Sequence, residues 1–431
     1  MSIEELYKLF AKCPIVSTDS RRIEEGSIFF ALKGDNFNGN VYAGDTLSSG
    51  AAYAVIDDIK YKKDERYILV DNVLETLQSL SRYHRIQLGI PIIAITGTNG
   101  KTTTKELTTA VLAKKFNVTS TKGNLNNHIG VPLTLLSMDD TTQIGIVEMG
   151  ANHQGEITAL CEIALPDFGI ITNVGKAHLE GFGSFEGVKT SKRELYQFIG
   201  KRGGNIFINT SNSHLIEMAK DITQTIGYRT NHEGIGIEGE LIHSSPTLVF
   251  KVKFPKGWLY IKTNLAGGYN LENALAAVCI GSYFSIEPLE IGNALESYIP
   301  SNNRSQFITS ERNQILIDAY NANPTSMNAA LESFITFEAP FKGVILGDMF
   351  ELGEGSTEEH QMIADKLQTM DLSMVLLVGH EFSRCKISSS FHVFEDNNLL
   401  INYLENLNPK GYLFLVKGSR GMKLEQVVEK L

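Results

Sequence analysis

Short, mostly apolar runs alternate with helix-like segments between residues 91 and 298. The runs are PIIAIT, GIVEMG, FGIITNVG and NIFINT. Continuous apolar strands of this kind are buried on both faces, which is typical of a parallel sheet covered by helices. The carboxyl ends of such strands meet at one edge, where ligands of open α/β sheets bind. The sequence therefore predicts an α/β fold with a ligand site at that edge.

Two further blocks flank this segment. Residues 1–84 contain the strand-like runs SIFFAL, YAVID and YILV, and the helix-like stretch LETLQSLSRYHRIQ then leads to Pro91. Beyond SYIPSNNRSQ, the runs ILIDAY, KGVILGDM, MVLLVG and YLFLVKG again alternate with helix-like stretches. TLVFKVKF and WLYIKTNL alternate around a PKG turn, which predicts a hairpin appended to the middle block. We expect three domains, at residues 1–84, 85–300 and 301–431.

Composition narrows the class of protein. A net charge of −10 and a pI near 5.6 argue against binding to nucleic acid or to an anionic membrane. The four cysteines show no C-x-x-C spacing, which fits reduced thiols in a cytosolic protein. The N-terminus, MSIEELYKLFAKCP, lacks the apolar core of a signal peptide, and no apolar run is long enough to span a bilayer. We expect a cytoplasmic protein without stable membrane insertion.

The stretch IIAITGTNGKTTTKELTT at 92–109 carries the strongest functional signal. A strand, a loop with Gly97 and Gly100, and a helix from Lys101 place backbone N–H groups at a helix N-terminus, which attracts phosphate. The strict phosphate-loop spacing puts its first glycine at Ile95, two residues before Gly97. The alternative is a tight strand–turn–helix connection with an exposed lysine. The flanking strand and helix favour the phosphate loop.

Polar residues follow other strands of the same sheet. Glu148 ends GIVEMG and His178 follows IITNVG, so both are expected at the edge that holds Lys101. Glu148 suits Mg²⁺, whereas Mg²⁺ prefers oxygen to a histidine nitrogen. A helix-capping carboxylate and a structural histidine are the alternatives.

Three loops are rich in amide, carboxylate and small side chains: GNLNNHIGVP (123–132), DAYNANP (318–324) and LGDMFELGEG (346–355). Amides that donate and accept suit sugar, peptide and purine groups. Asparagine-rich turn chemistry explains each of them equally well.

Together these stretches resemble the Mur ligase family of cell-wall enzymes. The resemblance extends over nearly the whole chain, from STDSRRIEEGSIFFALKG (17–34) to LFLVKGSRGMKLE (413–425). The resemblance implies a small α/β UDP-substrate domain, a central P-loop-type parallel-sheet ATPase domain and a C-terminal Rossmann-like domain. The family loop is G-T-N-G-K-[ST], and it is matched by Gly97, Thr98, Asn99, Gly100, Lys101 and Thr102. The late first glycine is therefore a family trait.

The resemblance also implies ATP and two Mg²⁺ ions. Lys101, Thr102 and Thr103 would bind phosphates, with Thr102, Glu148 and His178 as metal ligands. GVKTSKREL aligns with a segment that holds a carbamylated lysine, here Lys192. A carbamate would give Mg²⁺ oxygen donors, whereas a bare lysine would repel the metal. Lys189 is the competing candidate, and a solvated helix lysine is the alternative.

Further positions match the family's binding residues. Asn270 and Asn273 are expected at adenosine, with Tyr269 where the family has histidine. Arg304 is expected near the γ-phosphate and Asp318 near the ribose, so Lys101, Lys192, His178 and Arg304 form the implied catalytic set. The implied substrate-binding residues are Ser20, Arg21, Asn126, Asn127, His128, Asn321 and Asn323.

The motifs YNANP (320–324) and LGDMFELGE (346–354) are those of the family type that adds D-alanyl-D-alanine, and the D-N-P-R signature of the diaminopimelate-adding type is absent. The resemblance implies an ATP-dependent amide ligase that joins D-Ala-D-Ala to UDP-N-acetylmuramoyl-tripeptide through an acyl phosphate. It would act as a monomer in cytoplasmic peptidoglycan precursor synthesis. Its rivals are a ligase adding one amino acid or adding glutamate to folate, a phosphate-loop regulatory protein, and a scaffold with a vestigial site.

Overall fold

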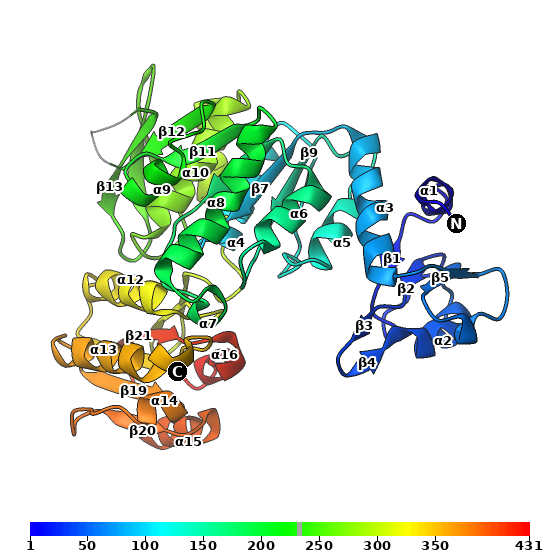
Figure 1. Ribbon diagram of the computed structural model, residues 1–431. Helices are drawn as coiled ribbons and strands as arrows, with labels where there is room; N and C mark the ends of the chain where they lie inside the picture. The colour runs from blue at the N-terminus through cyan, green and yellow to red at the C-terminus, as the bar shows by residue number, and fades with distance from the viewer. Residues whose placement is uncertain (231–234) are drawn as a thin grey trace.

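Three mainly parallel sheets and one two-stranded antiparallel ladder build the chain in this computed structural model, which describes residues 1–230 and 235–431. The predicted α/β class is confirmed. Figure 1 shows the N-terminal block joined to the middle block through the long helix α3 (Val73–Leu88), with the C-terminal block on another side of the middle block. Within the described residues, none of the helices combines the length and apolar surface that a membrane span needs.

The N-terminal block is a small parallel sheet with helices around it. Its strands, in spatial order, are β1 (Val16–Ser17), β2 (Ile28–Phe30), β5 (Tyr53–Ile56) and β6 (Tyr67–Leu69). A two-stranded ladder of β3 (Lys33–Gly34) and β4 (Phe37–Asn38) and the helices α1 (Ile3–Phe10) and α2 (Ala43–Ser48) complete it. The runs SIFFAL, YAVID and YILV are thus confirmed as strands.

Helix α3 attaches this block to the rest of the chain. It runs through the predicted boundary at residue 84 and packs against both α1 and the middle-block helices α5 (Gly130–Leu136) and α6 (Glu156–Ala164). The buried Arg85 guanidinium forms an ion pair with Asp167 at 2.7 Å. Pairing satisfies a charge that would otherwise be costly to bury, so this contact fixes the orientation of α3.

The middle block is built on a nine-stranded sheet. Its spatial order is β15 (Gly257–Lys262), β14 (Val249–Phe254), β13 (Ile237–His243), β12 (Thr225–Arg229), β11 (Asn205–Asn209), β10 (Phe168–Ile171), β7 (Ile92–Thr96), β9 (Ile144–Glu148), β8 (Val118–Ser120). The sheet is parallel from β8 to β13, and β13, β14 and β15 pair antiparallel. The predicted hairpin around PKG is confirmed as β14–β15.

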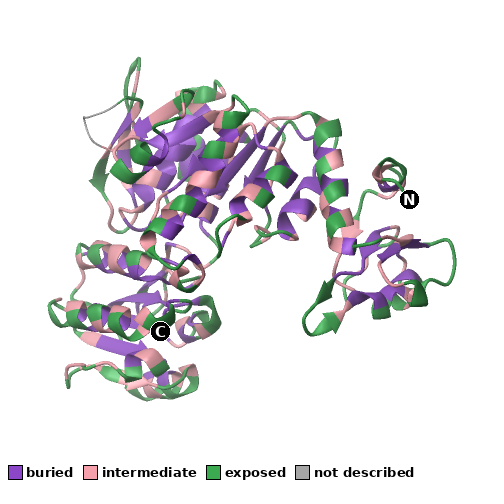
Figure 2. Ribbon diagram, in the orientation of Figure 1, coloured by how far each residue is buried: buried purple, intermediate pink, exposed green. Residues whose placement is uncertain are grey.

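Helices cover both faces of this sheet, which explains its continuous apolar strands (Figure 2). On β7, Ile93 and Ile95 face α4 (Lys101–Leu112), α10 (Asn270–Tyr283) and α11 (Pro288–Ser297). Ile92 and Ala94 face α5, α6, α8 (Phe185–Lys201) and α9 (Ser213–Met218). The strand period of two places alternate residues on opposite faces.

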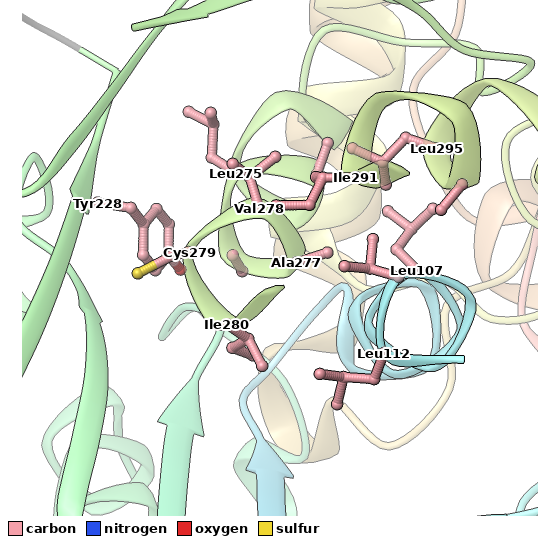
Figure 3. Close-up of a cluster of buried hydrophobic side chains, with 14 of the residues drawn as sticks. Leu107, Leu112, Tyr228, Leu275, Ala277, Val278, Cys279, Ile280, Ile291 and Leu295 are labelled. Atoms are coloured by element: carbon pink, nitrogen blue, oxygen red, sulfur yellow. The ribbon is translucent and has the colours of Figure 1, made fainter. Parts of the chain in front are cut away.

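The packing of α4 against α10 fixes the start of α4. Leu107 and Leu112 of α4 meet Ala277 and Ile280 of α10 in a fully buried cluster (Figure 3). Because α4 follows β7 after a four-residue loop, this packing sets where the loop and the helix N-terminus lie relative to the sheet edge.

The C-terminal block has a six-stranded sheet. Its spatial order is β16 (Gln306–Thr309), β17 (Gln314–Ile317), β21 (Tyr412–Lys417), β18 (Phe341–Gly347), β19 (Met374–Val378), β20 (His392–Phe394). Only β16 is antiparallel to its neighbour. The covering helices are α12 (Pro324–Ile335), α13 (Ser356–Gln368), α14 (His380–Ser383), α15 (Asn397–Leu407) and α16 (Glu425–Val428). All four predicted strands of this block are confirmed.

The core of this block is tested by Phe334→Ala. Phe334 of α12 is fully buried, so we expect truncation to lower the free energy of unfolding by about 3–5 kcal/mol. Phe341→Ala is the control, because Phe341 is 49% exposed and packs mainly on the Tyr412 ring. Urea unfolding followed by circular dichroism measures both. Equal losses for the two variants would contradict the core described here.

Candidate active site

A cavity of about 1000 Å³ lies between the carboxyl edge of the nine-stranded sheet and the C-terminal block. Most residues predicted from the sequence line it: Thr98, Asn99, Gly100, Lys101, Thr102, Thr103, Asn126, Asn127, His128, Glu148, His178, Asn270, Asn273, Arg304, Asp318, Asn321 and Asn323. Gly97, Lys192, Ser20 and Arg21 are not among its lining residues. The structure thus places predicted site residues that are as far apart in sequence as Thr98 and Asn323 around one cavity.

The loop between β7 and α4 forms one wall. Ile95, where the strict spacing would put glycine, lies inside β7 in the hydrophobic core, and the turn begins at Gly97. Gly97 and Gly100 have φ of +145° and +78°, and a Cβ there would lie 2.0 Å from Thr172 Oγ1 and 2.4 Å from Asn273 Oδ1. Glycine is therefore required at both positions.

The start of α4 is open to an anion. No side chain of the described residues caps this helix, so its first N–H groups have no such partner. The Lys101 ammonium donates to the carbonyl oxygens of Gly97 at 2.8 Å and Thr98 at 3.0 Å. Burial lowers the pKa of Lys101, Glu148 acts to raise it, and Arg304 lowers it further. Unpaired donors, the helix dipole and a nearby ammonium together fit phosphate.

Glu148 is a buried carboxylate beside this loop. Its two oxygens accept from Thr102 Oγ1 and Asn126 Nδ2, each at 2.8 Å. No group of three or more histidine, cysteine or acidic side chains suited to a metal occurs within residues 1–230 and 235–431. Mg²⁺ commonly takes one or two protein oxygens and completes its shell with phosphate oxygens and water. A carboxylate and a hydroxyl beside a phosphate loop fit that pattern.

His178 links the middle block to the C-terminal block. It precedes α7 (Leu179–Phe182) with φ of +50°, and its Nδ1 is in ion-pair contact with Glu351. Burial lowers the pKa of His178, although the Glu351 carboxylate acts to raise it. Glu351 lies in the loop after β18, within the motif LGDMFELGEG, and the sequence alone does not pair it with His178 because the two residues are far apart in the chain.

Lys192 and Lys189, the two lysines considered for carbamylation, have different surroundings. Lys189 pairs with Glu186 and Glu217 at 3.1 and 3.2 Å. Lys192 is 2% exposed, its Nζ lies 5.3 Å from the centre of the Phe182 ring, and no carboxylate of the described residues pairs with it. Burial, and then the charge of Lys101, lower the pKa of Lys192 to about 7. At pH 7 a substantial fraction of the Lys192 side chains is therefore the neutral amine, the form that can act as a nucleophile.

Asn270 and Asn273, the candidate adenosine-binding residues, form hydrogen bonds next to the phosphate loop. Asn273 Oδ1 accepts from Thr104 Oγ1 at 3.1 Å, and Asn273 Nδ2 donates to Asn270 Oδ1 at 2.9 Å. These bonds connect the start of α10 to α4. The hydroxyl of Tyr269 lies 3.0 Å from Ser305 Oγ, next to Arg304. Tyr269 thus connects the start of α10 to the segment that carries Arg304.

The C-terminal block supplies the opposite wall. Asp318 follows β17, and its carboxylate pairs with Lys417 at 2.6 Å. Lys417 ends β21, is 1% exposed and was not singled out from the sequence. The sequence feature that could have indicated Lys417 is its position at the end of the YLFLVKG strand. That strand pairs with β17, which ends just before Asp318.

Direct hydrogen bonds cross the junction between the two blocks. Asn323 Nδ2 donates to Asn99 Oδ1 at 2.8 Å, and Lys176 pairs with Glu359 at 2.7 Å. Thr325 Oγ1 accepts from the Lys176 backbone N–H at 3.0 Å. The C-terminal block is therefore held against the phosphate-loop side of the sheet.

The predicted first-domain residues lie elsewhere. Arg21 is exposed and forms an ion pair with Asp19 at 2.9 Å, and neither Ser20 nor Arg21 reaches the cavity. In the middle block, Asn127 Oδ1 accepts from the N–H of Gly130, the first residue of α5, at 2.9 Å, and the His128 carbonyl accepts from Gln78 of α3 at 3.0 Å. The loop 123–130 thus contacts both the cavity and the helix that attaches the first block.

Fold and site together define a phosphate-loop α/β protein whose cavity is completed by a C-terminal domain. The Mur ligase middle domain matches residues 95–281, and the domain described as "Mur ligase, glutamate ligase domain" matches residues 303–420. The chain belongs to the Mur ligase family.

Similar proteins share nearly the whole length. The UDP-N-acetylmuramoyl-tripeptide–D-alanyl-D-alanine ligase of Bacillus subtilis is 34% identical, over 96% of this chain and 92% of that protein. The crystal structure of MurF from Acinetobacter baumannii has a TM-score of 0.87 and 31% identity, covering 96% of this chain and 92% of that one. MurF ligase from Thermotoga maritima, in complex with ADP, has a TM-score of 0.85 and 26% identity, covering 96% of both chains.

The closeness of Gly100 to Asn273 gives a test of the loop. Gly100→Ala introduces a Cβ that meets Asn273, so we expect ATP binding to weaken at least about tenfold. Gly89→Ala is the control, because Gly89 has a similar φ of +62° with nothing within 4 Å of the added Cβ. Titration calorimetry with ATP measures both variants. ATP affinity that falls equally in both would show that backbone strain, and not this contact, matters.

Proposed function

We propose that this protein is an ATP-dependent ligase that joins D-alanyl-D-alanine to UDP-N-acetylmuramoyl-tripeptide. The observation that carries the proposal is the junction cavity, in which an uncapped helix N-terminus with Lys101 faces Arg304 of the C-terminal block. A relative named for this activity, 34% identical over 96% of the chain, supports the same conclusion. The reaction would belong to peptidoglycan precursor synthesis in the cytoplasm, carried out by a monomer.

The reaction joins a carboxylate to an amine in two steps. The terminal carboxylate of the tripeptide attacks the γ-phosphorus of ATP, forming an acyl phosphate and releasing ADP. The amine of D-Ala-D-Ala then attacks the acyl carbon, and phosphate leaves with one of the original carboxylate oxygens. No protein nucleophile is needed, so the residues act by binding, orientation and charge.

The chain's own groups meet the charge that moves during phosphoryl transfer. The N–H groups at the start of α4 and the Lys101 ammonium would bind the terminal phosphates, and Arg304 would approach from the other wall. Thr102 and Glu148 would hold one Mg²⁺, and His178 with a carbamate on Lys192 would hold another. Bound Mg²⁺ would neutralise phosphate charge.

The C-terminal loops support D-Ala-D-Ala as the second substrate. Tyr320, Asn321, Asn323, Phe350 and Glu351, from YNANP and LGDMFELGE, all line the cavity. These motifs support D-Ala-D-Ala over a single amino acid or a folate substrate. An assay of ADP release tests this substrate assignment. It uses UDP-tripeptides ending in lysine or in diaminopimelate, each with and without D-Ala-D-Ala. If the rate of ADP release does not depend on D-Ala-D-Ala, the result would support the alternative of a phosphate-loop regulatory protein.

Lys101 provides the sharpest test of the phosphate loop. We expect Lys101→Ala to lower ADP formation at least about 100-fold, because it removes a cation from the transferring phosphate. Binding of the UDP-tripeptide should survive, because Ser20 and Arg21 lie outside the cavity. Lys114→Ala, at an exposed lysine later in the same segment, should keep wild-type activity. Near-normal turnover by Lys101→Ala would overturn the role of the loop.

Lys192 is tested by chemical rescue. Lys192→Ala should lower ADP formation at least about tenfold by removing a metal-ligand side chain, and formate or acetate should restore part of it. Lys189→Ala should behave as wild type, since Lys189 pairs with Glu186 and Glu217 on the surface. Full activity of Lys192→Ala without any added acid would rule out a role for a carbamate at this position in the reaction.

A further inference from the structure

Tyr320 lies against two arginines on the cavity wall. It follows β17 and Asp318, and the guanidinium carbon of Arg304 lies 3.6 Å from the centre of its ring. Arg420, which follows β21, donates from Nη1 to the Tyr320 hydroxyl at 3.0 Å, with its guanidinium carbon 5.1 Å from the ring centre. All three residues line the cavity. One aromatic side chain therefore contacts two cations from distant parts of the sequence.

Within the described residues, no carboxylate neutralises the charge of Arg304. Among the described residues no carboxylate pairs with Arg304 or Arg420, and the buried Nε of Arg304 has no hydrogen-bond partner. Buried polar groups are normally paired, and the exceptions are common at functional sites. Among the described residues, the Arg304 guanidinium is thus held by stacking on the Tyr320 ring and not by a hydrogen bond or an ion pair.

The backbone presents Arg304 in a fixed conformation. Its neighbours Asn303 and Ser305 have φ of +53° and +48°, which is uncommon for residues other than glycine and costs free energy unless surrounding contacts hold it. The Ser305 carbonyl accepts from the Ala266 N–H at 3.1 Å, and the Ser305 N–H donates to Asp318 at 3.3 Å. The backbone is therefore fixed on the Ser305 side, and the ring fixes the guanidinium.

Stacking leaves the hydrogen-bonding edge of an arginine free. A guanidinium uses its face against an aromatic ring and its N–H groups in the plane, so both contacts are made at once. A carboxylate partner would instead occupy those N–H groups. The ring therefore stabilises a cation near Lys101 while leaving its donors free for an anion.

We propose that Tyr320 is a positioning residue that holds Arg304 by ring stacking, with its N–H edge free for the phosphate transferred at the Lys101 loop. This role rests on the proposed ligase function. The ring acts through Arg304 and does not itself contact the reacting atoms. Arg304 contacts the ring, whereas the hydroxyl bonds only to Arg420. The ring therefore contributes more than the hydroxyl to positioning Arg304.

Removing the ring tests this role. Tyr320→Leu should lower kcat for ADP formation about tenfold, with little change in the KM for the UDP-tripeptide. Tyr320→Phe keeps the ring and should recover most of that loss. Tyr260→Leu is the control, because Tyr260 is 64% exposed on β15, away from the cavity. Tyr320→Met, which keeps side-chain length without a ring, replaces the leucine variant if leucine lowers the Tm.

A double-mutant cycle separates positioning from general stability. In an Arg304→Ala background, Tyr320→Leu should cause no further loss of kcat, since the residue that it positions is gone. Equal fractional losses in both backgrounds, or wild-type kcat in Tyr320→Leu, would overturn the role of Tyr320. A wild-type protein that forms no ADP with UDP-tripeptide and D-Ala-D-Ala would instead contradict the ligase function itself.

Discussion

Four cations converge on one cavity, and the described structure gives only one of them a carboxylate in direct ion-pair contact. Lys101, Arg304, Lys417 and Arg420 all line the space, and Lys417 alone pairs, with Asp318. Like charges held together repel, as the effect of Arg304 on the pKa of Lys101 shows. The packing of α4 on α10, the stacking on Tyr320 and the bonds across the junction hold the cations in place. A polyphosphate bound beside Lys101 and Arg304 would relieve this repulsion.

Local patterns predicted the parts of the site that lie within one strand–loop–helix unit. Strand β7, the turn and the start of α4 follow from neighbouring residues, so Lys101 and Thr102 could be placed from sequence. The late first glycine also has a local cause, because Ile95 is needed in the core and the turn starts one residue after β7 ends. Periodicity likewise gave the four strands of the C-terminal block.

Contacts between distant residues could not be predicted in this way. Arg304 with Tyr320, His178 with Glu351 and Asp318 with Lys417 join segments whose spatial order depends on the whole sheet. Lys192 shows the same limit, because its burial without a carboxylate separates it from Lys189 only once α8 is packed. Ser20 and Arg21, which resemble the family's UDP-sugar motif, lie outside the cavity. In the proposed function the substrate would extend from the first domain past the loop 123–130, which contacts α3 through Gln78.

The central claim is that the tripeptide carboxylate is activated by phosphoryl transfer at the Lys101 loop. Tripeptide substrate labelled with ¹⁸O in its terminal carboxylate tests this claim directly, with mass spectrometry of the inorganic phosphate released on ligation to D-Ala-D-Ala. The account predicts one ¹⁸O atom from the carboxylate in each phosphate, because the acyl–oxygen bond breaks when the amine attacks. Phosphate without ¹⁸O, released alongside the ligated product, would contradict an acyl phosphate and the mechanism built on it.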